Sequence, residues 1–301
     1  MTKLIAEYCL SEGETKALEG KFMDESHYDQ VVDYDCDCYD RNGKPIFMFR
    51  KNYLPEDVLY DAFVNMKSAA VKTGNRGIAS GGVMKRRIKQ DGTLSKIQRA
   101  YIPGTDTFLD VESGIAGYFD RSSHWDFCRT TAFTRKHLDK YEKALPLIRA
   151  VDEGFKTLIP ERHSKQLAMA KATHPNFRIE DTAFTTITIN KDYRTAVHTD
   201  AGDYAAGFGN LVAYCKDIEP ALFVMPRFRI AIDLRTCDLL LCDVHQHHGN
   251  TDIIKKTKDA VRLSFVMYYR ENMWKCGSPT EELKRHQLNQ RRTAQEFAGI
   301  D

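Results

Sequence analysis

Short runs of β-branched and large apolar residues recur through the second half of the chain. The first, Thr185-Thr-Ile-Thr-Ile-Asn190, has the period of two that is typical of a strand. Similar runs cover residues 210–214, 222–225, 229–233, 239–242 and 263–269. Residues that favour turns separate these runs, and short strands at this spacing predict a barrel or a jelly roll.

Apolar residues at helical spacing occupy much of the first half. Pro55-Glu56 predicts the start of a helix, because proline and acidic residues are both favoured in a first turn. Gly74 is expected to end this helix. Residues 134–173 predict consecutive helices, the second opened by Pro146 and the third by Pro160. Strands and helices in this arrangement predict an α+β fold.

A set of metal-binding residue types lies beside the predicted strands. His198-Thr-Asp200 follows the first strand, and several histidines lie well downstream. A His-x-Asp pair with one distant histidine is the two-histidine, one-carboxylate arrangement that binds Fe(II) and leaves the remaining positions open. Arg262, with Ser264 two residues later, can form a bidentate pair with a dicarboxylic acid. An isolated His-x-Asp pair is common in solvated turns, but the combination predicts a 2-oxoglutarate-dependent oxygenase.

Three histidines could supply the distant ligand. In an extended strand, His245 and His247 would point to one face and His248 to the other. This alternation does not decide which of the three binds the metal.

The segment resembles the TET/JBP family of nucleobase dioxygenases, from residue 182 to residue 271 and more loosely back to residue 37. In that family the distant ligand is the histidine before a Gly-Asn or Cys-Asn pair, which is His248 here. Arg262 and Ser264 match the residues that hold 2-oxoglutarate. The run His198-Thr-Asp200-Ala-Gly-Asp203 is closer to the thymine-hydroxylase form, and Asp203 matches the position that contacts the target base.

This resemblance implies the fold, the cofactors and the substrate class. The expected fold is a double-stranded β-helix, or jelly roll, buttressed by helices. The expected cofactors are Fe(II), held by His198, Asp200 and His248, together with 2-oxoglutarate and O₂. The expected reaction is hydroxylation of the 5-methyl group of 5-methylcytosine or thymine in DNA, and a carboxylate at Asp203 could accept a hydrogen bond from either base. The competing interpretation is a hydroxylase of a free nucleobase, nucleotide or amino acid.

A glycine-rich segment followed by a cluster of cations lies between residues 73 and 101. A flexible loop joined to a cationic hairpin can bind DNA phosphates, although a solvated basic loop would have the same composition. The DNA interpretation assigns phosphate contacts to Lys85, Arg86, Arg87 and Lys89.

The composition bears on the cellular setting. The 301 residues carry a net charge of +2, which by itself does not indicate a nucleic-acid partner. There is no run of eighteen apolar residues and no apolar stretch typical of a signal peptide, so we expect an intracellular protein with no membrane contact. The eight cysteines form no Cys-x-x-Cys pair, and we expect reduced thiols in a reducing compartment, the cytoplasm or the nucleus.

We expect one dioxygenase domain over residues 1–301, and a monomer. Residues 1–35 would form a peripheral segment, and residues 36–180 would supply strands, the basic loop and supporting helices. Residues 181–271 would hold iron and 2-oxoglutarate. Residues 272–301 would be a charged helical tail.

Overall fold

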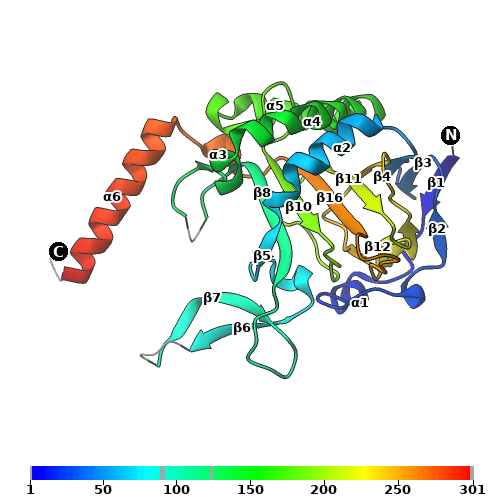
Figure 1. The fold of residues 1–301 in the computed structure, drawn as a ribbon, viewed down its shortest axis with the longest axis horizontal. Coiled ribbons are helices and arrows are strands. Elements are labelled where there is room, and N and C mark those ends of the chain that lie inside the picture. The colour runs from blue at the N-terminus through cyan, green and yellow to red at the C-terminus, as the bar shows by residue number, and fades with distance from the viewer. Residues whose placement is uncertain (1, 89–91, 123–124, 299–301) are drawn as a thin grey trace.

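The computed structural model describes residues 2–88, 92–122 and 125–298, without the side chains of residues 87, 95–98 and 292–298. Its strands form one large sheet, one small sheet and a separate hairpin (Figure 1). Every strand predicted between residues 185 and 269 is present, with bounds that differ by a few residues.

The large sheet has ten strands and is mixed, because β1 and β3 are parallel whereas the other neighbouring strands are antiparallel. Its order is β1 (Thr2–Ala6), β3 (Cys36–Asp40), β4 (Pro45–Arg50), β14 (Leu239–Cys242), β11 (Gly209–Lys216), β16 (Val261–Tyr268), β10 (Thr186–Lys191), β8 (Val111–Phe119) and β5 (Val71–Thr73), with β9 (Arg129–Thr130) paired to β8.

The small sheet has the order β15 (Gly249–Asn250), β12 (Phe223–Met225), β13 (Ile230–Ile232) and β2 (Gln30–Val32). The hairpin consists of β6 (Val83–Ile88) and β7 (Leu94–Tyr101).

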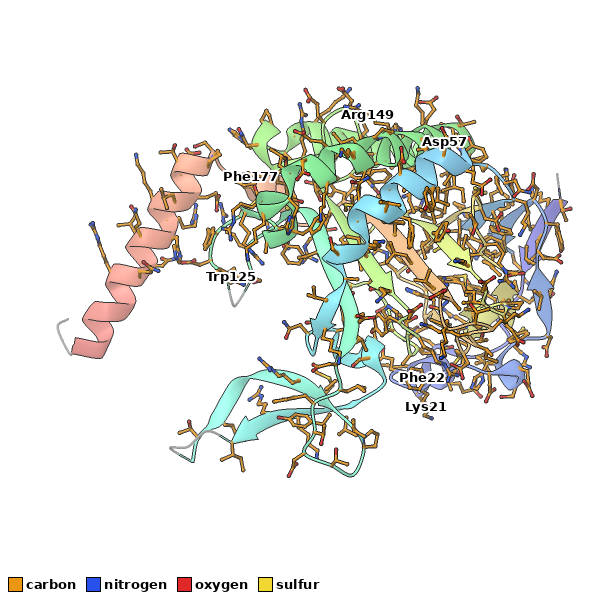
Figure 2. The ribbon with its side chains drawn as sticks, viewed as in Figure 1. Lys21, Phe22, Asp57, Trp125, Arg149 and Phe177 are labelled. Atoms are coloured by element: carbon orange, nitrogen blue, oxygen red, sulfur yellow. A yellow bond between two sulfur atoms is a disulfide. The ribbon has the colours of Figure 1, made fainter. Side chains whose placement is uncertain are left out.

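Helices cover one face of the large sheet. In Figure 1, α2, α4 and α5 lie across it, whereas α6 stands apart from the body. Asp57 of α2 and Arg149 of α4 are exposed on the outer side of this helical layer (Figure 2). The helices are α1 (Glu12–Lys16), α2 (Glu56–Met66), α3 (Ala132–Lys136), α4 (Leu138–Leu158), α5 (Pro160–Ala172) and α6 (Pro279–Ala298). The 3₁₀ turns are η1 (Glu25–His27), η2 (Lys67–Ala69), η3 (Gly77–Ser80), η4 (Pro175–Phe177), η5 (Pro226–Phe228) and η6 (Met273–Lys275).

The centre of the large sheet is buried on both faces. In β14, Leu239 and Leu241 belong to the core that includes the helices, whereas Leu240 and Cys242 belong to the core shared with the small sheet. Successive side chains of a strand point to opposite faces, so a strand between two cores must be apolar at every position. This explains why residues 239–242 form an unbroken apolar run.

Two predicted helix boundaries are wrong. Pro146 does not open a helix but lies inside α4. A proline inside a helix costs about 3 kcal/mol, and the buried residues of α4, which include Leu147, Ile148 and Val151, offset this cost by packing against the sheet and α2. Gly74 does not end the first helix either, because α2 ends at Met66 and β5 intervenes.

The expectation that all eight cysteines are reduced is also wrong. Cys128 and Cys276 form a disulfide, although 148 residues separate them in the sequence. The remaining six cysteines are free thiols. A pairing over this distance depends on the folded chain and leaves no local pattern in the sequence.

No helix in residues 2–88, 92–122 and 125–298 is both long enough and apolar enough to cross a membrane.

Candidate metal centre and active-site cavity

Two segments far apart in the sequence meet beside the small sheet. His198 follows β10, and His248 precedes β15. The two residues form an antiparallel bridge in which each backbone N–H donates to the other's carbonyl oxygen at 3.0 Å. This bridge places the two imidazole rings on the same side of the backbone, with centroids 4.4 Å apart.

The bridge brings three metal-binding side chains together. Asp200 Oδ1 lies 3.7 Å from His198 Nε2, and Asp200 Oδ2 lies 3.7 Å from His248 Nε2. One ligand atom from each residue fits within a cluster no wider than 4.8 Å. Neighbouring ligand atoms of an octahedral ion with bonds near 2.1 Å are about 3 Å apart, so the cluster needs only a slight contraction to hold a metal ion.

Both imidazoles are oriented for metal binding. His198 Nδ1 lies 2.8 Å from the carbonyl oxygen of Ala196, and His248 Nδ1 lies 2.9 Å from that of Gln246. An N–H at Nδ1 donates to these oxygens and leaves each Nε2 lone pair free. Burial, with a smaller contribution from His198, lowers the pKa of His248 to about 4, so His248 is neutral near pH 7, which is the form that binds metals.

The other two histidines of the cluster have different partners. His247 Nε2 lies 3.0 Å from Glu19 Oε1. His245 Nε2 lies 3.2 Å from the carbonyl oxygen of Asp203, and a hydrogen bond to Asp243 raises the pKa of His245. Of the three candidates, only His248 joins His198 and Asp200.

Arg262 enters the same region from β16. The residue is 4% exposed, and burial lowers the pKa of its guanidinium. Among the described residues no carboxylate forms an ion pair with this guanidinium, and its Nε has no hydrogen-bond partner. Ser264, two residues later, is also buried. The carboxylate of Asp192 is near enough to raise the pKa of Arg262 but does not pair with its guanidinium. A buried cation without a paired carboxylate fits a site that receives a carboxylate ligand.

Asp203 is a second buried group without a full set of partners. It is 8% exposed, and its Oδ2 has no hydrogen-bond partner among the described residues. Burial and the nearby Asp200 raise the pKa of Asp203 well above its usual range, whereas Arg270 opposes this shift. Arg270 Nε donates to Asp120 Oδ1 at 2.7 Å, and its guanidinium lies 4.0 Å from the centre of the Phe119 ring.

The metal-binding residues and both buried groups without full partners line one cavity of about 650 Å³. Its wall includes the three metal-binding residues, Arg262, Ser264, Asp203, Arg270 and Phe119. Pockets of roughly 300–1,000 Å³ are typical of small-molecule and cofactor sites.

Comparisons with known proteins identify the family. The model of the Tet_JBP family, the oxygenase domain of the 2OGFeDO superfamily, matches residues 114–271, which is more than half of the chain. The chain belongs to this family. The resemblance seen in the sequence is thereby confirmed, and membership implies Fe(II), 2-oxoglutarate and O₂ as cofactors.

Individual Tet_JBP relatives cover most of this chain, but the chain covers only part of them. The bifunctional helicase and thymine dioxygenase JBP2 of Leishmania tarentolae is 28% identical over 256 residues, which are 83% of this chain and 20% of the relative. The thymine dioxygenase JBP1 of Crithidia fasciculata is 32% identical over 270 residues, 88% of this chain and 30% of the relative. This chain therefore spans less than a third of either protein.

Among solved structures, NgTET1 in complex with 5mC DNA matches with a TM-score of 0.58 and 13% identity over 87% of each chain. At this identity the match establishes a shared fold.

In this Tet_JBP chain, sequence reasoning missed several cavity residues for which a signal was present. Arg262, Ser264, Val266, Tyr268 and Arg270 occupy every second position, and all five line the cavity. Since alternate residues of a strand share a face, identifying Arg262 and Ser264 could have led to Tyr268 and Arg270. Phe119, which lines the cavity, had no such signal because it comes from β8, and neither had Asp120, which bonds to Arg270 from the residue after β8.

The cationic hairpin leads out of the same cavity. Met84 of β6 lines the cavity, and Lys85 and Arg86 beyond it are exposed. The side chain of Arg87 and the whole of Lys89 lie outside the described residues. The predicted phosphate contacts at these two positions therefore have no structural counterpart to report.

Proposed function

We propose that this chain is an Fe(II)- and 2-oxoglutarate-dependent dioxygenase that hydroxylates the 5-methyl group of a pyrimidine in DNA, either thymine or 5-methylcytosine. The observation that carries the proposal is the unpaired, buried Arg262 in the cavity that also holds His198, Asp200 and His248. A metal-binding triad and a cation without a carboxylate partner are the two features that binding iron and 2-oxoglutarate requires.

The residues of the cavity have distinct roles in this proposal. His198, Asp200 and His248 hold Fe(II), while Arg262 and Ser264 hold the distal carboxylate of 2-oxoglutarate. Bound iron supplies the activation of O₂ that couples oxidation of 2-oxoglutarate to hydroxylation of the substrate. The protein orients the substrate methyl group toward the open side of the metal and excludes water from it.

Asp203 contacts the base in this proposal. Burial and the nearby Asp200 raise the pKa of Asp203, which favours the protonated carboxyl, and in that form it can donate a hydrogen bond through its O–H and accept one at its other oxygen. Phe119 and Tyr268 add aromatic surfaces to the same cavity.

DNA is favoured over a free nucleobase or amino acid because a cationic ribbon begins at the cavity. Lys85 and Arg86 are exposed on it, and Arg87 and Lys89 are proposed as phosphate contacts from the sequence alone. The relatives named thymine dioxygenases favour thymine, and the structural neighbour bound to 5mC DNA favours a DNA substrate. A base in a duplex has to leave the stack to reach the cavity.

We further propose a jelly-roll core and a single intracellular domain. The central strands of the large sheet and the small sheet form the two walls of a jelly roll. Residues 1–301 form one domain, with peripheral residues 1–35, supporting residues 36–180, the metal-binding core 181–271 and the helical tail 272–301. The domain acts as a monomer inside the cell, where its DNA substrate is located.

The test exposes anaerobically loaded Fe(II)/2-oxoglutarate enzyme to O₂ with either of two duplexes, one containing 5-methylcytosine and the other only thymine. Mass spectrometry of the digested nucleosides should show one added oxygen on one of these bases. If both bases stay unchanged while 2-oxoglutarate is consumed, the DNA assignment is wrong and a free metabolite is the substrate. If 2-oxoglutarate is not consumed either, the oxygenase assignment fails.

A further inference from the structure

The β6–β7 hairpin projects from the body of the molecule, below the sheets in the view of Figure 1. Its base is covered by Phe108, whose ring lies 4.9 Å from that of Tyr101, whereas Ile88 and Leu94 near its far end are exposed. The exposed side chains of the hairpin are therefore candidates for contacts with a binding partner.

The hairpin begins at the mouth of the cavity. Ala79 of η3, just before β6, accepts a hydrogen bond of 2.8 Å from the backbone N–H of Ala196, two residues before His198. Met84 lines the cavity itself. The four steps from Met84 to Ile88 extend about 13 Å at the usual rise per residue, so Ile88 lies well beyond the cavity wall.

Like charges face each other across this ribbon. Lys85 is directly opposite Arg99 in the ladder, a placement that destabilises a strand pair. Lys85 has one nearby carboxylate among the described residues, the fully exposed Asp106 at 3.9 Å, and such surface pairs contribute little. A bound polyanion would offset the repulsion between Lys85 and Arg99.

An exposed apolar pair follows the cations. Ile88 is opposite Leu94, and the two residues are 67% and 57% exposed. Ile88 is the most exposed large apolar residue of the described part of the chain. Some DNA-binding proteins contact phosphates with cations and insert neighbouring apolar side chains between bases. The hairpin has the same two kinds of side chain next to each other.

We propose that the β6–β7 hairpin is a wedge for duplex DNA. Lys85, Arg86 and Arg99 contact phosphates, and Ile88 and Leu94 enter the base stack at the place that the flipped pyrimidine leaves. The inference rests on the proposed function, since a DNA substrate is assumed, and adds how the target base is released from the duplex.

The test compares the same target base in a duplex and in a single strand. The variant Ile88→Ala/Leu94→Ala should lose about tenfold or more of its turnover on the duplex, because the cost of unstacking is no longer offset. On the single strand, which needs no wedge, its turnover should stay within about twofold of the unsubstituted protein. Ile88→Thr/Leu94→Thr should behave in the same way, and it keeps the strand propensity that alanine lowers.

A matched control is available on α6. Leu288 is 58% exposed, so Leu288→Ala removes the same kind of surface away from the hairpin and should leave both activities unchanged. A second readout uses 2-aminopurine next to the target base, with iron and 2-oxoglutarate bound and O₂ absent. The fluorescence increase on binding should be largely lost in both hairpin variants and retained in Leu288→Ala.

Three outcomes would overturn the wedge. Equal losses on duplex and single strand, or no loss on either, would mean that the apolar pair does not act in base release. Loss of binding to anionic vesicles, with duplex turnover intact, would indicate a membrane partner. A complete absence of oxidised base with the unsubstituted protein would refute the proposed function, and the wedge with it.

Discussion

The two histidines of the metal centre are oriented by the same kind of local hydrogen bond. Each ring bonds through Nδ1 to the carbonyl oxygen two residues earlier, Ala196 for His198 and Gln246 for His248. Both Nε2 atoms therefore lie near the carboxylate of Asp200. Hydrogen bonds at Nδ1 fix the orientation of metal-binding imidazoles.

Replacing His248 with alanine should abolish iron binding, whereas His247→Ala should keep most of it. His247 bonds to Glu19 at 3.0 Å and lies outside the metal cluster. Iron content after anaerobic loading and gel filtration, measured by elemental analysis, checks this prediction. If His247→Ala loses its iron and His248→Ala retains it, the distant ligand has been assigned to the wrong histidine.

Arg262→Met should raise the KM for 2-oxoglutarate by about 10- to 100-fold, since a charge-assisted hydrogen bond to the ligand contributes about 1.5–3 kcal/mol. In the absence of 2-oxoglutarate the same change should not lower the melting temperature. It removes a buried guanidinium that has no carboxylate partner among the described residues.

The control for Arg262 is Arg41→Met, because Arg41 is exposed, pairs with Glu7 at 2.7 Å and does not line the cavity. Its KM for 2-oxoglutarate should be unchanged. An unchanged KM in Arg262→Met would remove Arg262 from the co-substrate site.

At the scale of elements, β8 shapes the wall that carries Phe119. Gly117 in this strand has φ of +82°, and a Cβ at this position would lie 2.6 Å from the carbonyl oxygen of Thr185. The backbone N–H of Gly117 donates to Thr134 Oγ1 at 2.8 Å instead of to a neighbouring strand. The irregularity lies two residues before Phe119, which lines the cavity, and three before Asp120, which bonds to Arg270.

Gly117→Ala should destabilise the fold by about 2 kcal/mol or more, because a left-handed conformation costs a residue with a Cβ about 1–2 kcal/mol and the clash adds to it. Urea unfolding measures the difference. Gly13→Ala in α1 is the control, since nothing lies within 4 Å of a Cβ there, and it should be neutral or slightly stabilising. Equal stability of the two variants would contradict the role of Gly117.

The element α6 is held mainly through its first turns. Glu282 is 2% exposed, pairs with Arg121 and accepts hydrogen bonds from the backbone N–H groups of Cys128 and Gly277, both at 2.8 Å. Burial alone would raise the pKa of Glu282, but these partners lower it overall. The pairing therefore stabilises the protein above the pKa of an unfolded glutamate and is lost as the pH falls through the lower folded value.

At the scale of the whole molecule, both ends of the chain are tied to the catalytic region. The N-terminal segment supplies β1 to the large sheet and β2 to the small one, and Glu19 reaches His247. At the other end, the Cys128–Cys276 disulfide fixes the segment before α6 to the loop that follows Asp120. The peripheral segments thus support the walls of the cavity.

Alkylation of the denatured, unreduced protein should label six thiols of the eight cysteines, because Cys128 and Cys276 are joined. Intact-mass spectrometry gives the count, and labelling after reduction should give all eight. Cys276→Ser should expose one additional thiol, that of Cys128, when labelled without reduction. Eight labelled thiols in the unreduced protein would mean that the bridge is not formed and would restore the expectation of fully reduced cysteines.

The sequence by itself determined the strands of the core, the His198-x-Asp200 pair, Arg262 with Ser264, and the family. These features are local. A period of two, a short ligand spacing and a motif can each be recognised in a short run of consecutive residues. Helix ends were less well determined, because the packing of α4 outweighs the cost of Pro146.

The pattern of residues alone left three histidines as candidates for the distant ligand, and only the tertiary structure shows that His248 joins the metal cluster. The tertiary structure also shows which further residues line the cavity. The bridge between His198 and His248, the contact of Arg270 with Asp120, and the Cys128–Cys276 disulfide each join segments at least 50 residues apart. Such contacts depend on how the sheets and helices pack around both cores. These contacts are stabilised by the packing of the whole fold, so no local pattern in the sequence predicts them.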